Sequence, residues 1–293
     1  MYRLLIENSN SSSSKSLTED GIVNFSMFSE LDSPIDFKGF SIKYVFQGTE
    51  NYKVNGNKFR VNKGEYLLGN DFSEGKVNIG SNETVKGLCI DINPTILSEV
   101  VASFIEPGTP FSDIQLDKFF TSESFFENKY SLDKTKLGQL LFSLGEILDK
   151  DPFANHQFTK EFFYELAEKV VLDHRPILKQ INSINSLKVI TKKELYRKVL
   201  KGKDYIDSNY LSKIEINTIA KESNLSEYHF FRLFKSVFKI SPLQYIISKR
   251  LEIAKQLLQN KALKLADIAV ITGFSDMQSL SKAFKKAIWH LTF

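Results

Sequence analysis

Two short segments near the C-terminus carry side chains that could bind an acidic, hydrogen-bonding surface. Their candidate contact residues are Tyr228, Phe231, Arg232 and Lys235 in the first segment, and Met277, Gln278, Ser281, Lys282 and Lys285 in the second. An arginine donates two parallel hydrogen bonds, a glutamine amide both donates and accepts, and a lysine binds phosphate as a point charge. The base edges and phosphates of a nucleic-acid duplex offer matching partners. We therefore take these side chains as candidate DNA-binding residues.

The two segments belong to an internal repeat, with copies at 219–235 and 268–285. The offset between the copies is 49 residues up to Ser226 and Ser275 and 50 residues afterwards, so the second copy has one extra residue at its bend. Each copy fits a helix, a tight turn and a second helix. Ser226 and Ser275 are the predicted N-caps of the two second helices, because a serine hydroxyl can accept a bond from an unpaired backbone N–H.

Apolar pairs at i,i+4 predict which face of each second helix is buried. Phe230 with Phe234, and Leu280 with Phe284, would pack inward and leave the candidate contacts outward. Between the copies, Ser241-Pro242 is typical of a helix start. One connecting helix could hold two recognition helices about 34 Å apart, which is the spacing of successive major grooves on one face of DNA.

Residues from about 195 to 288 resemble the DNA-binding domain of the AraC/XylS family of bacterial transcription regulators. The matching positions are Ile219-Ala220, Leu225-Ser226, Phe230, Arg232, Phe234-Lys235, Ser241-Pro242, Tyr245, Arg250-Leu251, Ala254, Leu257-Leu258, Asp267-Ile268-Ala269, Gly273-Phe274-Ser275-Asp276 and Ala283-Phe284-Lys285-Lys286. The resemblance implies seven helices, binding to double-stranded promoter DNA, and recruitment of RNA polymerase or repression. It also implies base contacts from the second helix of each copy, at Tyr228, Phe231, Arg232, Met277, Gln278 and Lys282.

The sequence departs from the family pattern at three places. Lys239 stands where the family has Gly, and Leu280 stands where it has Phe. After Lys286 the chain lacks the Pro and Tyr of the family's closing segment, so we expect a truncated or altered end. The first two departures lie in or beside the predicted second helices, and the third lies beyond them.

The N-terminal part predicts a small β unit followed by helices. Short alternating runs between residues 37 and 92, with Asn55-Gly56 at a type I′ hairpin, predict a jelly roll. Residues 41–68 resemble the cupin-like sensor of the same family. Apolar stripes at 137–148 and 158–170 predict an antiparallel helical pair, which either packs on its own domain or forms a homodimer through residues 134–171.

The predicted fold class is α+β, with an N-terminal cupin-like β jelly roll and helical pair followed by an all-α domain with two helix-turn-helix units. The predicted domains are 1–110, a cupin-like sensor with a polar N-terminal segment at 8–16; 111–194, a helical dimerisation or linker segment; and 195–293, an AraC-type double helix-turn-helix domain.

Charge and composition narrow the function further. Residues 1–195 hold 22 basic and 27 acidic side chains, whereas residues 196–293 hold 17 and 8. A basic C-terminal third suits a polyanionic partner. No run is long and apolar enough for a membrane span, so the expected location is the cytoplasm.

The sequence is compatible with three classes of function. The first is a sequence-specific transcription regulator that responds to a small-molecule effector. The second is a cupin-type metal-dependent enzyme, and the third is an architectural DNA-binding protein with no ligand. All four histidines lie outside residues 1–155, and Cys89 is the single cysteine, so we expect no metal, no cofactor and no catalytic residue. The early aromatic residues could line an effector pocket or form ordinary core.

Overall fold

The computed structural model describes residues 1–6, 17–104, 113–259 and 263–289. The chain divides into two compact units, 1–178 and 179–293. The predicted boundary between residues 194 and 195 falls inside helix α5 (Val189–Asn209), whereas the two units separate after Leu178. The polar stretch 8–16 and residues 290–293 lie outside the described residues.

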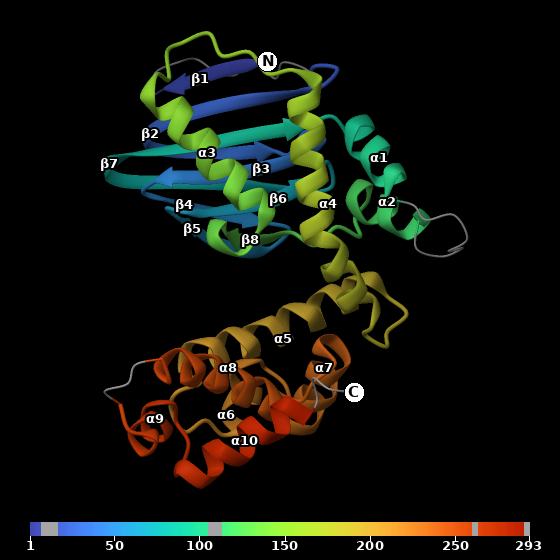
Figure 1. Ribbon diagram of the computed structural model, residues 1–293. Helices are drawn as coiled ribbons and strands as arrows, with labels where there is room; N and C mark the ends of the chain where they lie inside the picture. The colour runs from blue at the N-terminus through green and yellow to red at the C-terminus, as the bar shows by residue number, and fades with distance from the viewer. Residues whose placement is uncertain (7–16, 105–112, 260–262, 290–293) are drawn as a thin grey trace. The chain divides into compact units, whose positions relative to one another are not determined.

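The described part of the first unit contains an eight-stranded sheet (Figure 1). Its strands are β1 (Tyr2–Ile6), β2 (Gly21–Asp36), β3 (Phe40–Gln47), β4 (Thr49–Val54), β5 (Asn57–Asn62), β6 (Glu65–Asn70), β7 (Glu74–Ile92) and β8 (Asn128–Ser131). Two long strands, β2 and β7, pair antiparallel along almost their whole length. The first half of β7 also pairs with β4 and its second half pairs with β3, so the sheet folds around an apolar interior that includes Val45, Tyr52 and Val85.

The strands predicted between residues 37 and 92 are confirmed, and so is the Asn55-Gly56 turn. Asn55 has φ 47° and Gly56 has φ 80°, as a type I′ hairpin requires. The sequence prediction missed β1, β2 and β8. In β2, Val23, Phe25 and Met27 alternate with the polar Asn24 and Ser26, so the signal for a strand was present in the sequence.

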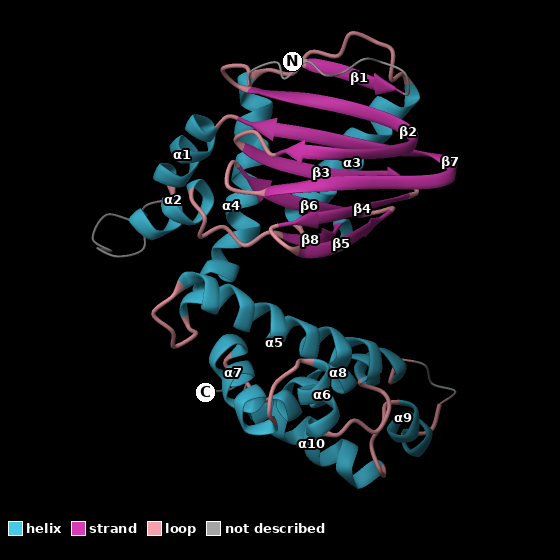
Figure 2. Cartoon of the chain, turned by 180° about the vertical axis from the view of Figure 1, so that it is seen from behind, coloured by secondary structure: helices cyan, strands magenta, loops and turns pink. Residues whose placement is uncertain are grey.

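The first unit also contains helices, which follow the first seven strands in the chain. They are α1 (Pro94–Ser103), α2 (Asp113–Thr121), the short 3₁₀ helix η1 (Leu132–Lys134), α3 (Lys136–Lys150) and α4 (Lys160–Asn182). Both views place α3 and α4 on one side of the strands (Figures 1 and 2). The two carboxylate oxygens of Asp173 on α4 accept bonds from the backbone N–H groups of Lys136 and Leu137, at 3.1 and 2.9 Å, which fixes the start of α3 against α4.

The predicted helical pair is confirmed, with one difference at its end. The second helix extends beyond the predicted stripe at 158–170, because α4 continues through Pro176 to Asn182. The connection to α5 is therefore residues 183–188 alone. A proline inside a helix removes one backbone hydrogen bond, yet α4 continues past Pro176.

The second unit is helical. After α5 come α6 (Ile216–Glu222), α7 (Glu227–Phe238), α8 (Pro242–Leu257), α9 (Leu265–Ile271) and α10 (Met277–Trp289). Helix α7 packs on α8, whose buried Leu251 and Ala254 form a second core with α9 and α10. Helix α8 begins with the predicted Ser241 N-cap and Pro242, and Gln244 completes a capping box. The predicted fold class is confirmed. In the described part of the chain, no helix is both long and apolar enough to cross a bilayer.

Candidate nucleic-acid interface

The turns of the two repeated copies have the same backbone geometry. Asn224 in the first and Gly273 in the second occupy the left-handed region, with φ 52° and 80°. Asparagine and glycine are the residues that adopt this conformation at low cost. In each copy the next residue donates its N–H back across the turn, from Leu225 to Ala220 O at 3.0 Å and from Phe274 to Ala269 O at 2.8 Å. Each copy is thus a helix-turn-helix.

The caps of the two second helices differ, and this explains the extra residue. In the first copy, the Ser226 hydroxyl accepts a bond from the N–H of His229 at 3.4 Å, as predicted. In the second copy, the Asp276 carboxylate accepts the bond from the N–H of Ser279 at 2.7 Å. The prediction that Ser275 is the N-cap is therefore wrong. Ser275 is the inserted residue, and the next residue offers a carboxylate, a charged acceptor at the positive end of the helix.

The inner faces of the second helices are buried as predicted. Phe230 and Phe234 on α7, and Leu280 on α10, have no measurable exposure, while Phe284 is half-buried within the second core. The inward pairs therefore hold both second helices in place and turn the candidate contacts outward.

The structure places eight of the nine candidate contacts on the solvent-facing side of α7 and α10. They are Tyr228, Phe231, Arg232 and Lys235 on α7, and Met277, Gln278, Lys282 and Lys285 on α10. Ser281 is half-buried. Tyr228 is 71% exposed.

The structure brings two of these residues together in a way that the sequence prediction missed. The Arg232 guanidinium lies 5.6 Å from the centre of the Tyr228 ring, and its Nη1 donates to the Tyr228 hydroxyl at 3.4 Å. The i,i+4 spacing of tyrosine and arginine on one helix is the signal that would have found this pair. The stacking holds the guanidinium over the outer face of α7.

The basic side chains on this surface are available to a partner. Among the residues that the structure describes, no carboxylate forms an ion pair with Arg232, Lys235, Lys282 or Lys285. Other basic residues of the same unit are paired, as Lys203 is with Asp207 at 2.6 Å. Unpaired cations on exposed helix faces fit a partner that carries phosphates.

The interior of the first unit holds a buried polar group. The Lys43 ammonium lies 2.6 Å from Cys89 Sγ and 3.6 Å from the Asp91 carboxylate, and it faces the Phe37 ring. Burial raises the pKa of the Cys89 thiol to about 11, so the thiol is protonated at neutral pH. In the described part of the chain, no three His, Cys, Asp or Glu side chains form a metal-binding group. Cys89 is a half-buried, protonated thiol beside Lys43, and the absence of a metal stays a prediction.

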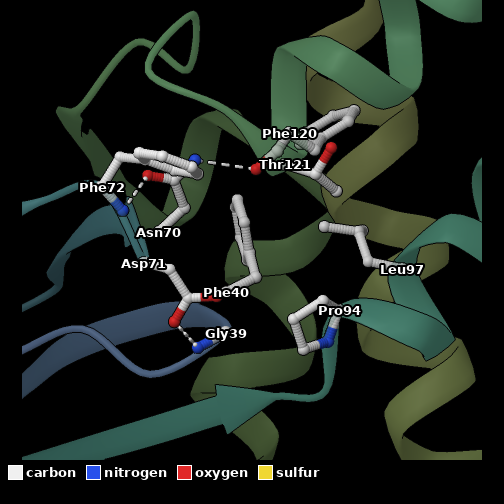
Figure 3. Close-up of a pocket in the computed structure, with 9 residues that line it drawn as sticks. All are labelled: Gly39, Phe40, Asn70, Asp71, Phe72, Pro94, Leu97, Phe120 and Thr121. Carbon is white, nitrogen blue, oxygen red and sulfur yellow. Dashed lines mark hydrogen bonds between the residues drawn. The ribbon is translucent and has the colours of Figure 1, made fainter.

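A small cavity of about 60 Å³ opens beside the Phe40 ring (Figure 3). Phe120 and Leu97 face that ring, and two polar side chains flank it. Asp71 accepts from the N–H of Gly39 at 2.5 Å, and Asn70 donates to the carbonyl of Phe120 at 2.8 Å. Both polar side chains are therefore engaged in hydrogen bonds to nearby backbone groups. The volume of the cavity is that of a few water molecules. Phe25, Phe37 and Phe40 are buried, as expected of core.

The comparisons with known proteins agree with this geometry. Residues 219–289 match a family model described as a helix-turn-helix domain. The probable transcriptional regulator LumQ of Photobacterium leiognathi is 36% identical over 83 residues, which are 28% of this chain and 34% of that protein. The uncharacterized HTH-type transcriptional regulator YbfI of Bacillus subtilis is 20% identical over 241 residues, which are 82% of this chain and 78% of that protein.

A solved structure of ToxT from Vibrio cholerae with a bound unsaturated fatty acid is 14% identical, with a TM-score of 0.38, and the alignment covers 93% of each chain. The C-terminal unit of the present chain carries a double helix-turn-helix domain of the AraC/XylS type, so the predicted resemblance is confirmed. The chain spans about a third of the length of LumQ, and the relatives that it matches there are transcriptional regulators.

Proposed function

We propose that this protein is a sequence-specific DNA-binding transcription regulator that places α7 and α10 in successive major grooves. The observation that carries the proposal is the pair of helix-turn-helix copies, each with an exposed second helix whose cations form no ion pair with a described carboxylate. An exposed helix of this kind fits the major groove, where base edges distinguish all four base pairs. The nine candidate residues on α7 and α10 are the proposed DNA contacts.

A selection experiment tests this function. The full chain is mixed with a pool of random duplexes, and the bound duplexes are sequenced after several rounds. A regulator of this kind enriches a bipartite site whose two halves lie about 10.5 base pairs apart. The double variant Arg232→Ala/Lys282→Ala should enrich no common site, whereas Lys255→Ala, which removes a cation from an exposed position of α8, should enrich the same site as the unmodified protein. A pool that shows no enrichment with the unmodified protein would refute the proposal.

We include further properties of such a regulator in this proposal. Recruitment of RNA polymerase or repression at a promoter, a cytoplasmic location and the absence of enzymatic activity all belong to the proposed regulator. An effector would bind in the first unit.

A homodimer through residues 134–171 would use the outer face of α3, where Phe142 and Ile147 are 53% and 58% exposed. Analytical ultracentrifugation of the protein and of a Phe142→Glu variant tests the dimer.

A further inference from the structure

One arginine in the connecting helix α8 contacts both the segment that leads into the first helix-turn-helix copy and the turn of the second copy. Arg250 donates from Nε to the carbonyl oxygen of Tyr210 at 2.6 Å and from Nη2 to that of Ser212 at 2.7 Å. These two residues lie between α5 and α6, at the entrance to the first copy. Its Nη1 donates to the carbonyl of Gly273 at 2.5 Å, in the turn of the second copy.

The backbone of the second turn also lies directly against the entrance segment. A Cβ atom added at Gly273 would lie 2.5 Å from the carbonyl oxygen of Leu211 and 3.0 Å from Cζ of Arg250. A side chain at this position would therefore force the two segments apart. The glycine has φ 80°, and the equivalent residue of the first copy is Asn224, which has no such restriction because it is exposed.

The two halves of α8 are each packed against a different copy. Near its start, Tyr245 stacks with Phe238 at 6.4 Å, and its hydroxyl donates to Asp207 of α5 at 2.7 Å. Near its end, Leu251 and Ala254 lie in the core of the second copy. Packing on one continuous helix sets the distance between the copies, but a helix alone leaves the angle of each copy about it less restricted. The Arg250 bonds close a second connection between the copies.

We infer that Arg250 and Gly273 form a clamp that fixes the orientation of α10 relative to α7, and so sets the half-site spacing that the protein accepts. This inference rests on the proposed function. A planar guanidinium can bond three carbonyls in different directions from one rigid group, which a lysine ammonium cannot do in the same geometry. Arg250 is a positioning residue here, since all its hydrogen bonds go to protein carbonyls.

The first test measures affinity as a function of spacing. The duplex that the unmodified protein selects is remade with one or two base pairs inserted or removed between the half-sites, and each half-site is also tested alone. One added base pair rotates the second half-site by about 34°, so the unmodified protein should lose about tenfold or more in affinity. In Arg250→Gln the intact site should bind about tenfold more weakly, while the spacing penalty should shrink to about threefold or less.

Controls separate the clamp from a general loss of folding. The affinity of Arg250→Gln for each half-site alone should stay within about twofold of the unmodified protein, since α7 and α10 keep their own cores. Lys255→Gln, on the same helix, should keep the steep dependence on spacing. Gly273→Asn places the first copy's own turn residue in the second copy, and it should reproduce the Arg250→Gln behaviour. A folded Arg250→Gln protein that keeps the steep dependence on spacing, or that loses half-site affinity equally, would overturn the inference.

The second test needs no DNA and remains decisive if the variants bind poorly. Spin labels at Lys235→Cys on α7 and Lys285→Cys on α10, in a Cys89→Ser background, report the distance between the two recognition helices. The clamp predicts a narrow distance distribution in the unmodified background and a broader one with Arg250→Lys or Arg250→Gln. Distance distributions of equal width in the unmodified background and the variants would contradict the clamp, even if the proposed DNA binding holds. Failure of the duplex selection would instead refute the proposed function, and the distance measurement would still test the clamp.

Discussion

At the scale of single residues, Arg232 is exposed, lies over the Tyr228 ring and forms no ion pair with any carboxylate of the described residues. Arginine can bridge O6 and N7 of guanine with two bonds. Arg232→Ala should therefore lower affinity for the selected site by about 1–3 kcal/mol and relax base preference in one half-site. Binding titrations on the selected duplex and on a scrambled duplex, at two salt concentrations, measure the effect.

The matched variants for Arg232 are Lys235→Ala and Lys285→Ala. Both lysines lie three residues beyond the predicted base contacts and are better placed for phosphate. Their loss should weaken all duplexes alike and reduce the slope of affinity against salt by about one unit each. An equal loss on both duplexes for Arg232→Ala would remove Arg232 from the base-reading set.

The buried His174 should make the stability of the first unit depend on pH. The His174 ring lies against Tyr130, with 4.9 Å between the ring centres, and its Nδ1 lies 2.8 Å from the carbonyl of Val170. Within the described residues, its Nε2 has no hydrogen-bond partner. Burial lowers the pKa of His174 from 6.5 to about 4. The unfolded chain therefore takes up a proton at a higher pH than the folded chain does. The free energy of unfolding should fall by about 3 kcal/mol as the pH decreases from about 6.5 to about 4.

Urea unfolding at a series of pH values measures this loss. His174→Phe keeps the aromatic contacts and removes the titrating group, so it should flatten the curve in that pH range. His229→Gln, at an exposed position of α7, should leave the curve unchanged. A wild-type slope that survives in His174→Phe would assign the pH dependence to other groups.

At the scale of elements, the N-cap of α10 is a direct consequence of the inserted residue. Backbone and side-chain bonds from Ser279 and Ser275 lower the pKa of the Asp276 carboxyl, so the cap is charged at neutral pH. Asp276→Ala should lower the midpoint of thermal unfolding of the second unit by a few degrees (about 2–4 °C), whereas Ser275→Ala should change it little. Calorimetry of both variants decides between the two caps, and the opposite order would restore Ser275 as the cap.

Helix α7 ends at a strained residue, Lys239, which stands where the family pattern has glycine. Lys239 has φ 62°, a left-handed conformation that disfavours residues with a Cβ, and it ends the helix with its N–H bonded to the carbonyl of Lys235 at 2.9 Å. Lys239→Gly should raise the free energy of unfolding by about 1 kcal/mol. Lys239→Ala, which keeps the strain and loses the bond from Nζ to Ser236, should not stabilise the protein. Denaturant titrations of the two variants make the comparison.

At the scale of the whole molecule, the segment between α4 and α5, near the boundary of the two units, should be the site of proteolysis. Residues 183–188 join α4 to α5, and Leu187 is fully exposed. Limited digestion with chymotrypsin or thermolysin should cut there and release a basic C-terminal fragment that binds DNA. Mass spectrometry locates the cut, and a gel-shift assay tests both fragments. DNA binding by the acidic N-terminal fragment alone would show that the functions are assigned to the wrong units.

The sequence alone determined the second unit and most of its candidate interface. The i,i+4 pairs Phe230/Phe234 and Leu280/Phe284 specify which side of each helix is buried, so the outward set followed by elimination. Local rules also determined the Asn55-Gly56 turn and the helical pair, because turn chemistry and apolar periodicity act within a few residues.

Only the tertiary structure decided the features that depend on residues far apart in the chain. The sequence could not show that β2 pairs with β7, since its polar positions are satisfied by a strand some 60 residues away. It could not choose between Ser275 and Asp276 as the cap, because both lie within reach of the helix start. The Arg250 contacts were invisible for the same reason: the carbonyls that it bonds lie 40, 38 and 23 residues away, and only the folded backbone brings them to one guanidinium.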